Sequence, residues 1–272
     1  MRSVYVKALR FFVPITGMES ALKTFTVGMQ NRIYGIAYTM EQVMKGEVLL
    51  VKYGLPALIA VMGILYIFVI PDEPQAVKLL FKLIPMWLII AYGYLQMPSK
   101  RKSCHWMIGI GLFFCMLGDG LLVWFIVGLS AFLIGHLFYV TAFISRWRFS
   151  AIRFFMLIPI LAYASFMSWH LIQALIQANN YALAAAVLVY ITVISFMTWS
   201  AIMTGNKLAM AGSVLFAVSD SILAWDRFVS DVVFAGPLIM ITYYSAQFLI
   251  ASSLRTIAQD KPSTAIHSGD LA

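Results

Sequence analysis

From residue 54 onward, the chain is a succession of continuous apolar runs, each about 20 residues long and separated by short polar breaks. An α-helix of about 20 residues crosses the hydrocarbon core of a lipid bilayer. Because the apolar positions are continuous and do not alternate with polar ones, the pattern disfavours a transmembrane β-barrel. The runs therefore predict an all-α membrane protein, folded as a helical bundle with short loops.

Composition supports the same class of protein. Hydrophobic residues make up 62% of the chain and charged residues 11%, whereas a soluble domain carries about 25% charged residues. So few charges cannot cover a surface that faces water, which excludes a soluble enzyme. The net charge of +8 comes from basic residues in the gaps between apolar runs. That placement fits anionic lipid headgroups and predicts no nucleic-acid partner.

The polar breaks divide the chain into eight expected membrane spans. We place them at residues 54–70, 77–97, 103–121, 124–144, 150–171, 181–203, 207–225 and 234–254. When alternate loops are assigned to one side, that side collects the seven basic residues of the N-terminal segment and Lys100, Arg101, Lys102, Arg146, Arg148, Arg153, Lys207, Arg255 and Lys261. The other side keeps only Lys78 and Arg227 as basic residues. The positive-inside rule then predicts that both termini are cytoplasmic.

Three parts of the chain differ in character. Residues 1–52 form a basic segment that we expect to be interfacial or disordered, residues 53–256 form the transmembrane helical domain, and residues 257–272 form a cytoplasmic tail. The first segment has no small-residue cleavage site ahead of a soluble domain, so we do not interpret it as a signal peptide. The expected location is the endoplasmic reticulum membrane in a eukaryote, or the inner membrane in a bacterium.

The ionisable residues that we single out inside the expected spans are Lys82, Asp119, His136 and Asp220. Such groups are costly in a bilayer and usually mark a functional site. Lys82, Asp119 and Asp220 lie toward the outer ends of their spans, although these spans run in opposite directions. The sequence therefore predicts that the three side chains meet at a similar depth.

Uncharged polar residues extend this predicted group. Tyr139 lies three residues after His136, and Gln247 lies four residues after Tyr243, so each pair shares one helix face. We expect one polar cavity in the outer half of the bundle to collect these residues together with the ionisable ones.

Each candidate also has a purely structural interpretation. Lys82 can extend its ammonium group toward the headgroups, and Asp119 follows Gly118 at a span end, where it can cap a turn. A single buried histidine such as His136 can serve as an interhelical hydrogen-bond partner. The same applies to four further side chains, which can hold helices together: Tyr190, Tyr243, Tyr244 and Gln247.

Several chemistries are excluded by what the chain lacks. A zinc hydrolase needs three or more convergent ligands, and of the four histidines only His136 is central in a span. The two cysteines, Cys104 and Cys115, lie in or beside the same apolar run, which indicates neither a disulfide framework nor a thiolate site. There is no Walker-type phosphate loop and no G-x-S-x-G motif. The remaining candidates are two carboxylates with His, Lys and Tyr, and we expect no metal or other cofactor.

Four segments resemble the YhhN-type lysoplasmalogenase family: Leu117–Asp119, Phe132–Tyr139, Gly212–Ala224 and Thr242–Gln247. Their order and spacing agree with that family, and the resemblance covers roughly residues 54–255. The F-x-x-S-D-S-x-L-A and T-Y-Y-x-A-Q motifs are the most specific parts of it. The chain departs from the family in its long N-terminal segment and in Cys115, where a small polar residue is expected.

The resemblance implies hydrolysis of the vinyl-ether bond of lysoplasmalogens. The products are a fatty aldehyde and glycerophosphoethanolamine or glycerophosphocholine, and no metal is required. A vinyl ether is protonated at carbon, water adds to the resulting oxocarbenium ion, and the hemiacetal collapses. A buried carboxylic acid suits the proton transfer, and an ionised carboxylate suits the cation. Asp119 and Asp220 are assigned to these two roles, with the order left open.

The resemblance also implies roles for the other polar residues. His136 and Tyr139 would position water or relay protons, and Lys82 would bind the phosphate of the lipid. Further substrate contacts are expected from Tyr190, Ser219, Tyr243, Tyr244 and Gln247. The expected partners are a lysophospholipid substrate and membrane lipid, and no residue pattern indicates an oligomeric state.

Two other classes of function use the same features. A proton-coupled or small-solute transporter would employ the buried acids as a relay, and a receptor or scaffold would need no acid pair. Release of aldehyde by purified protein in detergent distinguishes them, because an enzyme needs no membrane gradient.

Overall fold

The computed structural model describes residues 38, 46, 49–71 and 73–258. The chain divides into two units, Met1–Gly54 and Leu55–Ala272. In the first unit, a π-helical segment, η2, spans Leu50–Gly54. Most of the expected N-terminal segment (1–52) and C-terminal tail (257–272) lies outside the described residues.

The second unit is helical, and its described residues contain no β-strand. Its helices are α2 (Leu55–Phe68), α3 (Gln75–Gln96), α4 (Ser103–Leu121), α5 (Phe125–Ile144), α6 (Ala151–Phe155), α7 (Leu157–Gln177), α8 (Tyr181–Thr204), α9 (Lys207–Phe228) and α10 (Ala235–Ser253). The predicted all-α bundle is therefore confirmed.

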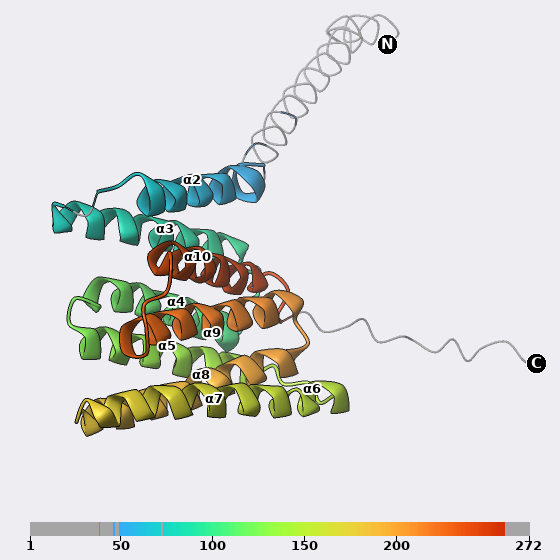
Figure 1. Cartoon of the computed structure of the whole chain (residues 1–272). Helices are drawn as coiled ribbons and strands as arrows, with labels where there is room; N and C mark the ends of the chain where they lie inside the picture. The colour runs from blue at the N-terminus through green and yellow to red at the C-terminus, as the bar shows by residue number, and fades with distance from the viewer. Residues whose placement is uncertain (1–37, 39–45, 47–48, 72, 259–272) are drawn as a thin grey trace, which may run out of the picture. The chain divides into compact units, whose positions relative to one another are not determined.

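The helices of this unit form a stack in which α10 and α9 are central (Figure 1). Helix α10 contacts α2, α3, α4 and α9, whereas α8 contacts α5, α7 and α9. The most extensive helix–helix contacts are between two pairs of consecutive helices, α4 with α5 and α9 with α10. In Figure 1, α2 lies at one edge of the stack and α7 at the other.

Within the described residues, seven helical segments are long and apolar enough to cross a membrane, and they correspond to the first seven expected spans. The eighth, α10, is also 19 residues long but carries polar residues such as Thr242, Tyr243 and Gln247. It tolerates them because Tyr243 and Gln247 are buried against neighbouring helices, and the Thr242 hydroxyl donates to backbone carbonyls of its own helix. The protein is thus an integral, multi-pass membrane protein.

Large apolar side chains cover the outside of the bundle. On α7, Leu161, Phe166 and Trp169 are exposed, and on α2 so are Leu58 and Ile64. A soluble protein of this size would not expose so much apolar surface, whereas a lipid-facing one requires it.

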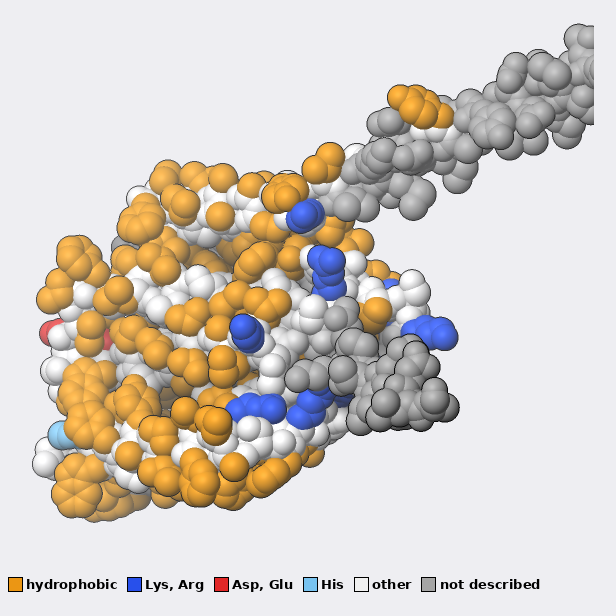
Figure 2. All heavy atoms as spheres, turned by 90° about the vertical axis from the view of Figure 1, so that its right-hand side faces the viewer, with side chains coloured by type: hydrophobic (Ala, Val, Ile, Leu, Met, Phe, Trp, Pro, Cys, Tyr) orange, Lys and Arg blue, Asp and Glu red, His pale blue; other side chains and the backbone are white. Residues whose placement is uncertain are grey.

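The two ends of the bundle differ in charge. We call one of them the basic end, where the loops and helix termini carry Lys100, Arg101, Lys102, Arg146, Arg148, Arg153, Lys207 and Arg255. Figure 2 looks onto this end, where the Lys and Arg side chains gather. The opposite end holds the α2–α3, α4–α5, α7–α8 and α9–α10 connections, with Glu73, Asp226, Arg227 and Asp231.

Short side-chain caps define the helix ends near the basic end. Gly205 follows α8 with a φ of 71°, a left-handed conformation that favours glycine. Asn206 then caps α9, because its side-chain oxygen accepts hydrogen bonds from the N–H groups of Leu208 (3.0 Å) and Ala209 (3.1 Å). Its amide also donates to Oγ1 of Thr256 at 2.8 Å, which ties the start of α9 to the segment after α10.

The fifth span differs from the expected range of 150–171. It consists of the short α6 and of α7, which continues to Gln177. The interruption at Met156 has a local cause: Pro159 has no N–H to donate to the carbonyl of Phe155, four residues earlier. At the other end no breaker occurs before Asn179, whose positive φ of 56° ends the helix.

Helices α4 and α5 approach closely because glycines face the partner helix. A Cβ on Gly111 would lie 2.4 Å from Cε1 of Tyr139, and one on Gly135 would lie 2.9 Å from Sγ of Cys115. Small residues allow such contact between membrane helices. The close packing sets the position of the α5 face that carries His136 and Tyr139.

Candidate active site

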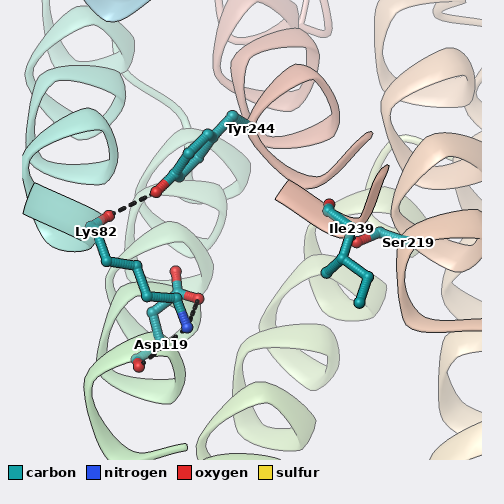
Figure 3. A network of polar contacts seen from close by, with 5 residues as sticks. All are labelled: Lys82, Asp119, Ser219, Ile239 and Tyr244. Carbon is teal, nitrogen blue, oxygen red and sulfur yellow. Dashed lines mark hydrogen bonds and ion pairs between the residues drawn. The ribbon is translucent and has the colours of Figure 1, made fainter. Parts of the chain in front are cut away.

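Lys82 of α3 and Asp119 of α4 form an ion pair inside the bundle. The Nζ atom of Lys82 lies 3.2 Å from Oδ1 of Asp119, and it also donates to the backbone carbonyl of Asp119 at 3.4 Å. The two side chains are 14% and 4% exposed, respectively. Figure 3 shows Tyr244 of α10 donating to the backbone carbonyl of Lys82, at 2.7 Å. These contacts tie α3, α4 and α10 together.

Tyr190 of α8 and Asp220 of α9 form the second polar pair. The Tyr190 hydroxyl donates a hydrogen bond to Oδ2 of Asp220, so the other carboxylate oxygen, Oδ1, is not used by this bond. Asp220 is also close enough to Asp119 for the two carboxylates to interact electrostatically. Each of the two aspartates has its own polar partner, Lys82 for Asp119 and Tyr190 for Asp220.

His136 lies between the polar residues of α8 and those of its own helix. Its ring centroid is 4.6 Å from that of Phe216, 5.3 Å from that of Tyr190 and 6.4 Å from that of Tyr139. All three contacts are edge-on, and the His136 side chain is completely buried. Apolar and aromatic neighbours therefore fix the orientation of the imidazole.

Tyr139 and Gln247 connect α5 to α10. The Tyr139 hydroxyl donates to Oε1 of Gln247 at 2.8 Å, and both residues are fully buried. The Cys115 thiol of α4 lies against both side chains. A larger residue at position 115 would press on this pair, since Sγ already lies near Gly135.

Five buried polar atoms of this region have no hydrogen-bond partner among the described residues. They are Oδ2 of Asp119, Nδ1 and Nε2 of His136, the hydroxyl of Tyr243 and Nε2 of Gln247. Tyr243 lies beside Asp119, close enough to interact with its carboxylate. Buried polar groups are normally satisfied by protein or by water, so these atoms mark a polar cluster among the packed helices.

A cavity of about 350 Å³ lies between α5, α7, α8 and α9. Its lining is mainly apolar, and its polar residues are Tyr163, Tyr190, Ser195, Thr198, Asp220 and Ser221. Among the described residues that line it, Asp220 is the sole carboxylate. The volume lies within the range of about 300–1,000 Å³ that is typical of small-molecule pockets.

The cavity reaches the outer surface of the bundle between α7 and α9. Tyr163 of α7, Val214 and Val218 of α9 all line it, and they are 49%, 41% and 39% exposed. Since this surface faces lipid, a molecule within the membrane can enter sideways without passing through water.

The YhhN family model matches residues 77–254, which is more than half of the chain. The chain belongs to the YhhN family. It is 31% identical to mouse lysoplasmalogenase TMEM86B over 189 residues, which cover 68% of this chain and 78% of the mouse protein. It is 32% identical to bovine lysoplasmalogenase TMEM86A over 200 residues, covering 67% and 80% of the two proteins. No solved structure matches the chain significantly.

The sequence predicted one cavity that collects Lys82, Asp119, His136, Asp220 and Gln247. In this YhhN protein all five residues lie in the same region, but only Asp220 lines the cavity. The other four are packed between helices behind its wall, because the ion pair, the Tyr139–Gln247 bond and the aromatic rings fill the space there.

Ser219 was predicted to contact substrate, and the structure gives it another position. Its hydroxyl donates to the backbone carbonyl of Ile239 on α10 at 2.9 Å, away from the cavity (Figure 3). Ser221, two residues later, lines the cavity instead. Thr198 was also overlooked, although its spacing of eight residues from Tyr190 indicates the same face of α8.

Metal ligands do not cluster in the part of the chain that the structure describes. No group of three or more His, Cys, Asp or Glu side chains is placed to share an ion there.

Proposed function

We propose that this YhhN protein is a lysoplasmalogenase, which hydrolyses the vinyl-ether bond of a lysoplasmalogen. The products are a fatty aldehyde and glycerophosphoethanolamine or glycerophosphocholine. The names of the mouse and bovine relatives support the substrate class. The laterally accessible apolar cavity supports a substrate with a long hydrocarbon chain.

One observation carries the proposal: Asp220 lies in the wall of an apolar cavity, with one carboxylate oxygen held by Tyr190 and the other not used by that bond. Hydrolysis of a vinyl ether begins with proton transfer to carbon, which needs a positioned acid. Asp220 is the carboxylate that can touch a molecule inside the cavity. We therefore assign the acid role, which the sequence left open between two aspartates, to Asp220.

The proposed reaction uses one carboxyl group twice. Protonated Asp220 transfers its proton to the alkenyl carbon that is not bonded to oxygen, and the adjacent carbon becomes an oxocarbenium ion. Water then adds to that carbon and gives its proton to the Asp220 carboxylate, which restores the acid. The hemiacetal breaks its carbon–oxygen bond, and the proton of its hydroxyl passes to the departing glycerol oxygen. The net change is addition of one water molecule and release of aldehyde and alcohol.

The remaining residues of the site act around Asp220. Asp119 is the second carboxylate of the proposal, and it acts through its charge on the positively charged intermediate, because it does not line the cavity. Lys82 holds Asp119 in place. Behind the cavity wall, His136, Tyr139 and Gln247 form a polar cluster that can hold water for the reaction, since His136 and Gln247 have unsatisfied nitrogen atoms.

We further propose that both termini are cytoplasmic and that the basic end faces the cytoplasm. The gathering of Lys and Arg at that end supports this orientation (Figure 2). The membrane is that of the endoplasmic reticulum if the source is eukaryotic, and the inner membrane if it is bacterial. The lysophospholipid then enters from the leaflet at the opposite end of the bundle.

The test is aldehyde release from a lysoplasmalogen by purified protein in detergent, with wild type compared to Asp220→Asn. Asparagine keeps the shape of the side chain but cannot donate a carboxylic proton, so turnover should fall by about 10²–10⁴-fold. Asp119→Asn should have a smaller effect, on the order of tenfold, as expected for a charge that acts from a distance.

Asp226→Asn is the matched control, because this carboxylate lies on the same helix but does not line the cavity. It should keep wild-type turnover. A folded Asp220→Asn protein with most of its activity would contradict the acid role. A wild-type protein that releases no aldehyde in detergent would favour the transporter alternative.

A further inference from the structure

Arg227 lies at the end of the cavity that is farthest from the basic end. It precedes Phe228, which lines the cavity, and its guanidinium carbon lies 4.2 Å from the ring centroid of Phe125, which also lines it. Phe125 and Phe228 are in edge-on contact at 5.6 Å. The exposed Arg227 side chain is therefore held by a cation–π contact against the aromatic residues that line this end of the cavity.

We propose that Arg227 binds the phosphate group of the lysophospholipid whose vinyl ether reacts at Asp220. The proposal rests on the proposed function, and it adds a headgroup subsite that also determines substrate choice. A guanidinium group suits this task, because its donors can form two parallel hydrogen bonds with phosphate oxygens.

The spacing along α9 fits the substrate. The step from Asp220 to Arg227 is seven residues, which corresponds to two turns on one helix face and to roughly 10 Å along the axis. In a lysoplasmalogen, the carbon that receives the proton is separated from phosphorus by about seven bonds, or on the order of 9 Å when extended. One molecule can thus reach both residues.

The direction of the cavity fits as well. On α9 the lining residues extend from Phe228 to Val214, a distance of roughly 21 Å along the helix. With its phosphate at Arg227, the lipid would direct its chain past Asp220 toward Val214 and Val218. There the cavity is open to the surrounding lipid. This is the orientation of a lysophospholipid in one leaflet, with its headgroup at the interface.

The sequence assigned the phosphate to Lys82, but the geometry favours Arg227. Lys82 is engaged by Asp119 at 3.2 Å and lies on α3, which contacts α2, α4 and α10 and not the helices around the cavity. Lys78 also lies on α3 and does not line the cavity. Around Arg227, the neighbouring Asp226 is engaged by the N–H of Val232 at 2.9 Å. Asp231 is the other acid between α9 and α10.

The experiment compares two substrates in a phosphate-free maltoside detergent. One is a lysoplasmalogen, and the other is the corresponding 1-alkenylglycerol, which has the same vinyl ether but no phosphate. For Arg227→Gln we expect the KM for lysoplasmalogen to rise about 10- to 100-fold with little change in kcat, because a charge-assisted contact is lost in both ground and transition states. The kinetics with 1-alkenylglycerol should change less than about twofold, since no phosphate contact exists to be lost.

Lys78→Gln is the matched control, because it removes one positive charge at the same end of the bundle without touching the cavity. It should leave both substrates unaffected. Equal loss with both substrates in Arg227→Gln would indicate a structural or membrane-anchoring role, and no loss with either would also overturn the proposal.

A binding measurement separates this proposal from the proposed chemistry. The saturated 1-O-alkyl lysophospholipid has no vinyl ether and cannot react, so its affinity, measured by calorimetry, reports on the subsite alone. Binding that weakens in Arg227→Gln and not in Lys78→Gln would support the headgroup subsite even if wild type released no aldehyde. Unchanged binding would refute it even if the enzyme were active.

Discussion

The ion pair between Lys82 and Asp119 allows a quantitative test of the packing around the site. Its side chains are 14% and 4% exposed, with Nζ and Oδ1 3.2 Å apart. Removal of one partner from a fully buried pair costs about 3–5 kcal/mol, because the other charge loses its compensation. Lys82 is partly exposed, and its long side chain can extend further from the bundle interior when its partner is removed. Both properties reduce the free-energy cost of losing Asp119. We therefore expect Asp119→Asn to lower the free energy of unfolding by about 2–4 kcal/mol.

The double variant Lys82→Met/Asp119→Asn removes both charges together. Its stability should lie within about 1 kcal/mol of wild type, because buried ion pairs contribute little beyond compensating their own desolvation. The coupling between the two positions should then reach at least about 2 kcal/mol.

The assay is reversible unfolding by sodium dodecyl sulfate in mixed micelles, followed by far-ultraviolet circular dichroism. Additive effects of the two substitutions, or a single variant as stable as wild type, would refute the reasoning. Either result would mean that the pair is solvated and does not hold α3 against α4.

Two further predictions concern packing and topology. Gly111→Ala should lower the free energy of unfolding by about 1–3 kcal/mol, since its Cβ would lie 2.4 Å from the Tyr139 ring. Gly109→Ala is the control and should not lower the free energy of unfolding, because the nearest atom to its added Cβ is the end of Met97 at 3.5 Å. Equal destabilisation by Gly111→Ala and Gly109→Ala would argue against the close α4–α5 contact. For topology, cysteines introduced at the exposed positions Ala178 and Lys207 should react with a membrane-impermeant maleimide from opposite sides, with the native Cys104 and Cys115 buried and silent. Reaction of both from one side would contradict the assigned orientation.

Much of the site could be predicted from the sequence because a charge in a membrane span is rare. Lys82, Asp119, His136 and Asp220 stand out against apolar neighbours, and the structure brings all four into one region. Their pairing could not be predicted in the same way. It depends on helix rotation, and a rotation of α3 would direct Lys82 to lipid without any change in hydrophobic pattern.

The cavity could not be predicted from the sequence. Its wall comes mainly from apolar residues such as Leu129, Met167 and Val187, which have no chemical signature in a chain that is 62% hydrophobic. Arg227 was likewise seen only as a loop charge, because its position over Phe125 joins two segments about a hundred residues apart.

Local composition was enough to predict that this chain is a helical membrane protein and where most of its helices begin and end, with the end of α7 at Gln177 as the main exception. These properties follow from the transfer of each segment between water and lipid, which depends on local composition. Local composition could not predict which aspartate faces a cavity, which one pairs with Lys82, or where that cavity opens. Those outcomes depend on how neighbouring helices rotate and approach, and this is set by small contacts such as those of Gly111 and Gly135 between α4 and α5.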